Sequence, residues 1–163
     1  PTFTQDETGR GHFYGHAAES AKMADAILRR LKSPNELRER VVLLIEKHML
    51  RPLTDKKFLR RQLSKLGWEA FEQLLQLQQA DMDSKGVDEP GADYPKIYAL
   101  LQEIREEDSC LTLKDLAVNG RDLMALGFSG PAIGQCLNSL LQQVLDEQLP
   151  NEKEALLKAA RQM

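Results

Sequence analysis

The sequence predicts an all-α protein with two helical sub-domains. Apolar residues recur at helical spacing in most segments, and no segment sustains the two-residue alternation that is typical of a half-buried strand. Many of these segments begin or end at a proline, a glycine or a capping residue. Residues 84–93 (SKGVDEPGAD) form the clearest loop. We therefore place the boundary there and assign residues 1–85 and 86–163 to the two sub-domains.

The first sub-domain is expected to begin with a loop over residues 1–14, which show no periodicity. The helices expected after it cover residues 16–32, 34–48, 55–66 and 68–83. Pro34 suits the first turn of a helix, Thr54 is a capping residue, and Gly67 suits a helix end. The residues expected to face inward from the first two helices are Ala17, Ala21, Ala24, Leu28, Leu31, Leu37, Val41, Leu44, Ile45 and His48.

The helices expected in the second sub-domain cover residues 94–108, 112–119, 122–126, 131–144 and 151–160. Thr112 and Asp115 have the spacing of a capping box, which predicts a short helix beginning there. Pro131 is pre-organised for the first position of the long helix. The apolar residues that fall on one face of this long helix are Ile133, Leu137, Leu140 and Val144.

The start of the long helix, at Gly130, is a candidate anion site. A helix start presents free backbone N–H groups, and the glycine allows another chain to approach closely. The alternative interpretation of the same residues is a packed helical corner without a ligand.

Composition excludes several classes of protein. Charged residues make up 29% of the 163 residues and apolar residues 42%, as in ordinary globular proteins. No apolar run approaches the ~20 residues needed to cross a bilayer, and no secretory signal pattern is present. Cys110 and Cys136 form no metal or disulfide pattern, so free thiols in the cytoplasm are expected. Because the chain begins at Pro1 without a methionine, we expect it to be a fragment or a processed product.

Charge is distributed unevenly along the chain, although its net value is only −3. Residues 29–65 contain twelve Lys or Arg against four acids, and residues 71–109 contain ten acids against three bases. A basic surface of this kind can bind phosphates with salt-dependent affinity. The candidate RNA-binding residues are Arg51, Lys56, Lys57, Arg60, Arg61, Lys65, Lys114, Arg121 and Gly130. The alternative is a solvated helix surface whose cations pair with the acidic neighbour.

Two pairs of segments resemble one known family. The stretch NGRDLMALGFSGPAIGQCLNSLLQQV with NEKEALLKAA (residues 151–160) resembles the RNA-binding tail of bacterial tRNA nucleotidyltransferases, which comprise CCA-adding enzymes and related poly(A) polymerases. The stretches GHFYGHAAESAKMADAILRRLK and LLIEKHML resemble the second half of the HD-type domain in the same family. The resemblance implies a tRNA-binding body and tail, with tRNA as partner. It also implies that a catalytic head, using Mg²⁺ with ATP and CTP, precedes this chain, which itself would hold no cofactor and no catalytic residue.

The same resemblance raises the question of a metal site. His16 and His48 match later histidines of HD-type domains, and Asp81 matches an acidic position, so the three are candidate ligands of a divalent metal. The adjacent His-Asp pair that defines such domains does not occur in this sequence. The alternative is that His48 is a core histidine and His16 a helix-start residue.

Asp81 and Asp83 have the spacing of the metal-binding pair of nucleotidyltransferases, but we reject that role because residues two apart diverge on a helix.

Two other functions stay open on the sequence alone. A metal-dependent HD-type phosphohydrolase would use His16 and His48. A helical protein-interaction module would instead expose an apolar stripe, expected on residues 131–144.

Overall fold

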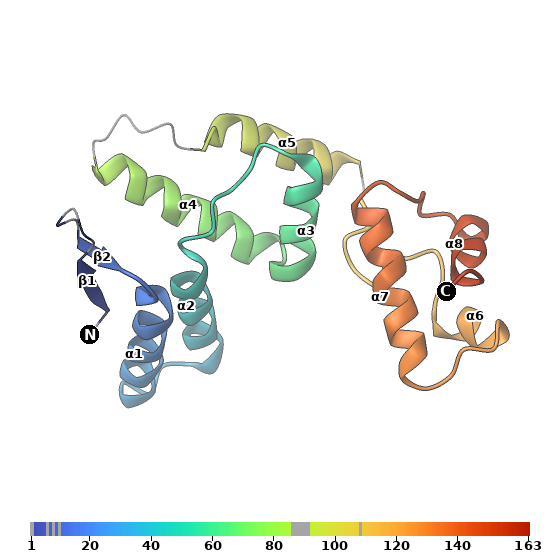
Figure 1. Cartoon of the computed structure of the whole chain (residues 1–163), viewed down its shortest axis with the longest axis horizontal. Helices are drawn as coiled ribbons and strands as arrows, with labels where there is room; N and C mark the ends of the chain where they lie inside the picture. Colours follow the sequence, from blue (N-terminus) through green and yellow to red (C-terminus); the bar gives the residue numbers. More distant parts are fainter. Residues whose placement is uncertain (1, 6, 8, 10, 86–91, 108) are drawn as a thin grey trace. The chain divides into compact units, whose positions relative to one another are not determined.

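The computed structural model describes residues 2–5, 7, 9, 11–85, 92–107 and 109–163 (Figure 1). These residues form eight helices and one short β-hairpin, which confirms the all-α class. The chain divides into two compact units. Unit 1 comprises Pro1–Arg51 and Trp68–Gly91, and unit 2 comprises Pro52–Gly67 and Ala92–Met163. The sub-domain boundary after residue 85 stays a prediction, and the compact units are interleaved along the chain.

The β-hairpin corrects the expectation of a loop over residues 1–14. Strand β1 (Phe3–Gln5) pairs with antiparallel β2 (Gly11–Phe13), and Phe3 lies opposite Phe13 with ring centroids 5.3 Å apart. Each strand has three residues, which is too short for a two-residue alternation to appear in the sequence.

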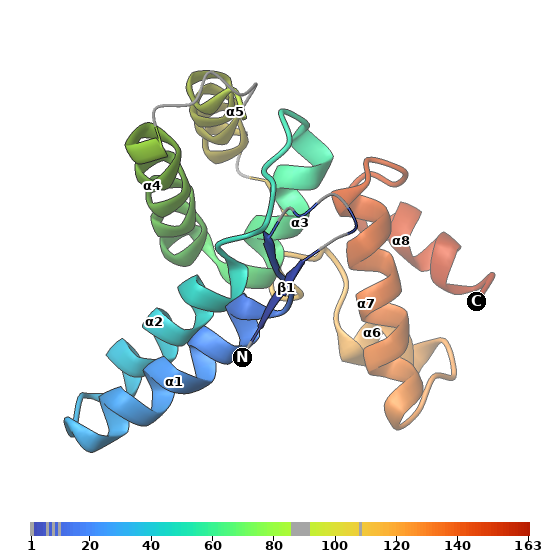
Figure 2. The ribbon, with the colours of Figure 1, turned by 60° about the vertical axis from the view of Figure 1, so that its left-hand side comes forward.

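Unit 1 contains three helices, α1 (His16–Arg30), α2 (Asn35–Lys47) and α4 (Trp68–Lys85). Helices α1 and α2 lie side by side, and α2 also contacts α4 (Figure 2). The fully buried apolar side chains of this unit are Ala21, Ala70, Phe71, Leu74 and Leu75. Leu31 and Leu37 were expected to face inward, but they are 64% and 51% exposed because they flank the turn between α1 and α2.

Unit 2 contains five helices, α3 (Lys56–Leu66), α5 (Tyr94–Glu106), α6 (Gly120–Ala125), α7 (Pro131–Leu145) and α8 (Lys153–Ala160). Helix α3 packs against α5 and α7, and α6, α7 and α8 pack against one another. Its fully buried residues include Leu59, Leu63, Ile97, Ile104, Leu123, Leu140, Leu145 and Leu156. None of the described helices is long and apolar enough to pass through a membrane.

Helix ends in unit 2 follow capping chemistry, with two corrections. The residue that caps α3 is Asp55, not Thr54, because the Asp55 carboxylate accepts the N–H of Phe58 at 2.7 Å. Gly67 ends this helix with φ 77°, a backbone conformation that favours glycine. The predicted helix over residues 112–119 is instead a turn, and Asp115 accepts hydrogen bonds from Leu111 and Thr112 there.

Helix α7 begins at Pro131 as predicted, but its buried face is rotated from the expected one. The residues that it buries are Cys136, Leu140, Leu141 and Leu145, so only Leu140 of the predicted stripe is fully buried. Both cysteines are free thiols, in agreement with the sequence. Burial raises the pKa of the Cys110 thiol to about 11, which keeps it protonated and unreactive near neutral pH.

Candidate functional site

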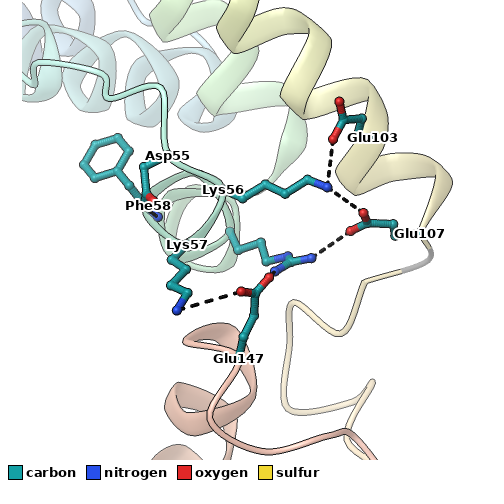
Figure 3. Close-up of polar contacts among 8 residues, drawn as sticks. Asp55, Lys56, Lys57, Phe58, Glu103, Glu107 and Glu147 are labelled. Atoms are coloured by element: carbon teal, nitrogen blue, oxygen red, sulfur yellow. Dashed lines mark hydrogen bonds and ion pairs between the residues drawn. The ribbon is translucent and has the colours of Figure 1, made fainter.

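Helix α3 positions the basic cluster, which we define as Lys56, Lys57, Arg60 and Arg61. Leu59 and Leu63 are buried in the core of unit 2, which fixes the rotation of the helix about its axis. The four cations consequently face the ends of α5 and α7, and carboxylates of both segments contact them. Figure 3 shows these contacts for Lys56 and Lys57.

Lys56 and Arg60 are the most covered members of the basic cluster. The Lys56 ammonium lies 2.8 Å from Glu103 and 2.6 Å from Glu107, both on the last turn of α5 or just after it. Arg60 contacts Glu107 at 2.7 Å through one terminal nitrogen and Glu147 through the other, and its side chain is 13% exposed. The Arg60 Nε is buried and has no hydrogen-bond partner among the described residues. These two cations therefore fasten α3 to α5 and to the end of α7.

Lys57 and Arg61 are more exposed and form fewer ion pairs. Arg61 Nε lies 2.6 Å from Asp146, and its side chain is 45% exposed. Lys57 is 48% exposed and lies 3.8 Å from Glu147, at the outer limit of an ion pair (Figure 3). Both anions follow the last turn of α7, where the helix dipole disfavours negative charge.

The ion pairs lower the pKa values of two of these carboxylates, as expected for charge pairing. Hydrogen bonding from Lys56 lowers the pKa of Glu107, and hydrogen bonding from Arg61 lowers the pKa of Asp146. In the free chain, therefore, the basic cluster pairs with acidic neighbours, which was the alternative left open by the sequence. Phosphate binding by this cluster requires an exchange of anions.

The remaining candidate RNA-binding residues lie on separate segments. Arg51 and Lys65 are exposed, after α2 and near the end of α3 respectively, and Lys114 and Arg121 are exposed in the turn before α6 and in α6. In the described part of the chain, no hydrogen bond or ion pair engages these four side chains. Gly130 precedes α7 with φ 54°, and no side chain caps that helix start.

A histidine pair is the notable polar feature of unit 1. His16 begins α1, His48 follows α2, and their Nε2 atoms lie 3.1 Å apart. The Nδ1 atom of His16 is 2.7 Å from the carbonyl oxygen of Phe13, and that of His48 is 2.6 Å from the carbonyl oxygen of Ile45. Because a carbonyl only accepts, each Nδ1 is the donor, and two Nε2 lone pairs then face each other. The histidine pair therefore places two hydrogen-bond acceptors opposite each other at 3.1 Å.

The third predicted ligand does not join the histidine pair. Asp81 lies exposed on α4, and within the described ranges no group of three or more His, Cys, Asp or Glu residues could hold a metal ion. Among the described residues, the two histidines supply too few ligands for a complete site, so no hydrolytic step is derived from them and the metal site stays a prediction. Asp81 and Asp83 both lie on α4, and this helical position is the reason for rejecting them as a nucleotidyltransferase metal pair.

Gln78 lies beside the histidine pair and was missed by the sequence analysis. This residue of α4 is 7% exposed, and its amide nitrogen donates to the carbonyl oxygens of His48 (2.9 Å) and Leu50. Gln78 thereby holds the chain segment that carries His48. The sequence also did not predict that carboxylates pair with the basic cluster on α3. Acidic residues at the C-terminus of a helix are disfavoured by the helix dipole, so they indicate a cation nearby.

Comparison with known proteins gives a consistent result. A family profile described as tRNA nucleotidyltransferase domain 2 matches residues 12–160. A CC-adding tRNA nucleotidyltransferase of Thermus thermophilus is 31% identical over 152 residues, which cover 91% of this chain and 33% of the relative. A CCA-adding enzyme of Latilactobacillus sakei is 44% identical over 73 residues, covering 44% of this chain and 17% of the relative.

A multifunctional CCA protein of Aromatoleum aromaticum is 37% identical over 98 residues, which cover 55% of this chain and 23% of the relative. The chain thus spans about a third or less of the length of these three relatives. No solved structure gives a significant match to the chain.

Proposed function

We propose a tRNA-holding role for this chain, which belongs to the tRNA nucleotidyltransferase family. In this role the chain is the body and tail of an enzyme that adds CCA, or A, to tRNA 3′ ends. It positions the tRNA and leaves nucleotidyl transfer, with Mg²⁺, ATP and CTP, to a catalytic head outside this chain. The observation that carries the proposal is the basic cluster on α3, within a family whose named members act on tRNA.

The chemistry of the basic cluster suits a substrate class that varies in sequence. Contacts from Lys and Arg to phosphates are independent of base sequence, and they lose affinity as salt rises. Folded RNA is recognised mainly by shape and by contacts to the backbone and the 2′-hydroxyl groups. An enzyme that must accept many tRNAs needs recognition of this kind.

The test is a titration of the chain with unfractionated tRNA at several salt concentrations, with a DNA duplex of similar length as control. We expect preferential tRNA binding, with the logarithm of the affinity falling linearly with the logarithm of the salt concentration. Equal affinity for tRNA and DNA, or no binding at low salt, contradicts a tRNA-holding role for this chain.

A second candidate, metal-dependent phosphate hydrolysis, rests on the histidine pair alone. If His16 and His48 bind a divalent metal, Mn²⁺ or Ni²⁺ should raise the thermal midpoint of unfolding, and His48→Ala should abolish the rise. An unchanged midpoint over a range of metal concentrations removes this candidate. The alternative of a protein-interaction module predicts no salt-dependent affinity for RNA. The same tRNA titration therefore distinguishes it from the tRNA-holding role.

A further inference from the structure

The basic cluster contains two kinds of cation. Lys56 and Arg60 are 26% and 13% exposed, and each contacts two carboxylates. Lys57 and Arg61 are about half exposed, and one carboxylate is in ion-pair range of each. The two kinds alternate along α3, so they lie on adjacent strips of one helix surface.

We propose that Lys57 and Arg61 bind RNA phosphates, and that Asp146 and Glu147 occupy these two cations when RNA is absent. The inference rests on the proposed tRNA-holding function and assigns that function to two of the four cations. Glu147 contacts both Arg60 and Lys57, and it leaves only Lys57 when RNA binds. Lys56 and Arg60 therefore keep their carboxylates in both states and hold α3 in place. Binding is thus an exchange in which two carboxylates are replaced by two phosphates.

The physical basis of the exchange is the similarity of the two anions. Carboxylates and phosphates both accept charge-assisted hydrogen bonds from Arg and Lys, and Arg has a fork that suits either group. Asp146 contacts Arg61 through Nε, so a phosphate can approach the terminal guanidinium nitrogens and then displace Asp146. Exposed ion pairs contribute little to stability, so their replacement does not unfold the protein. Arg60 differs because its side chain is covered and bridges two segments.

The freed carboxylates oppose binding. When phosphates arrive, Asp146 loses Arg61 and Glu147 loses Lys57, while Glu147 keeps Arg60. Both carboxylates lie at the C-terminal end of α7 and then face both the helix dipole and the RNA. Neutral isosteres at these positions are therefore expected to bind RNA more tightly than the original chain does.

The experiment compares tRNA affinity and its salt dependence in the original chain and in the double variant Asp146→Asn/Glu147→Gln. The expected gain in tRNA affinity is about two- to fivefold for each pair removed. The slope of log affinity against log salt concentration should become steeper by roughly one to two. The matched control is Glu19→Gln/Asp25→Asn on α1, which removes the ion pairs Glu19–Lys22, Asp25–Arg29 and Asp25–Arg38 and changes net charge equally. A gain no larger than that of the control overturns the proposal.

A reverse variant tests the cations directly. Lys57→Gln/Arg61→Gln should weaken tRNA binding and reduce the salt slope by roughly two, while thermal unfolding confirms that the chain remains folded. An unchanged slope in this folded variant also overturns the proposal. If the original chain binds tRNA but neither double variant alters binding, the exchange is wrong and the tRNA-holding role stands. If the original chain shows no preference for tRNA, the proposed function itself fails.

Discussion

Unit 1 and unit 2 differ in how well their helices cover apolar surface. Helix α2 of unit 1 buries no residue fully, and Met23, Ile27 and Leu37 on α1 and α2 are 43–62% exposed. Helix α7 of unit 2 alone buries four residues. All of these helices show clear apolar periodicity, so periodicity predicts that a helix forms but not that a partner covers it. The comparison also predicts that α1 and α2 contribute less to the chain's stability than α7 does.

The largest expected effect comes from the core of unit 2. Leu59→Ala should lower the free energy of unfolding by about 3 kcal/mol, because it leaves a cavity at a fully buried site. Val41→Ala on α2 is the matched change in unit 1, and it should cost less than about 1 kcal/mol because Val41 is only half-buried. Chemical denaturation measures both. Equal losses would show that the two units are equally well packed.

The next effect concerns the link between α3 and its neighbours. Arg60→Ala should lower the free energy of unfolding by about 2 kcal/mol, because it removes charge-assisted hydrogen bonds and leaves two carboxylates without their covered partner. Arg29→Ala removes an exposed pair on α1 and should cost little. A loss for Arg60→Ala no greater than that for Arg29→Ala would mean that Arg60 does not fasten the helices.

A smaller effect is expected from the polar contact that orders unit 1. Gln78→Ala should cost about 1 kcal/mol, since two carbonyls near the end of α2 lose their donor. Hydrogen exchange should show faster opening around His48 and Leu50, with unit 2 unchanged. Faster exchange in α7 would contradict a local role.

The smallest effect is a pH dependence of unit 2. The folded pKa values of Glu107 and Asp146 lie below their ordinary values, so the stability that these carboxylates contribute is present above about pH 4.5 and is lost as pH falls through the lowered pKa values. The thermal midpoint should therefore fall below about pH 4.5. Glu107→Gln with Asp146→Asn should flatten this fall, and an unaltered acid profile would rule these pairs out as its cause.

Local signals in the sequence predicted most helix bounds but not the partners of α3. Leu59 and Leu63 face the core, and their spacing alone determines which side of the helix is apolar. The carboxylates that engage the basic cluster are 40 to 90 residues away, and no local pattern connects them. The family resemblance makes His16, His48 and Asp81 candidate metal ligands. The structure brings the two histidines together, and no group of three candidate ligands occurs among the described residues.

Two similar capping patterns show where local prediction fails. Asn119 and Asp122 form a complete capping box and begin α6. Thr112 and Asp115 have the same spacing but form a turn, because the side chain of Asn151 donates to the carbonyl of Asp115 and accepts the N–H of Ala117. A distant asparagine thus occupies backbone groups that a helix would use.

The interleaved path of the chain limits how far α3 can move when it loses its contacts. Both ends of Pro52–Gly67 continue directly into unit 1, so a detached α3 is a short loop with two anchored ends and not a free tail. Closing a short loop with two anchored ends costs less entropy than recapturing a free tail. Local opening of α3 should therefore reverse quickly. A protease that cuts inside this loop would make the detachment of α3 irreversible.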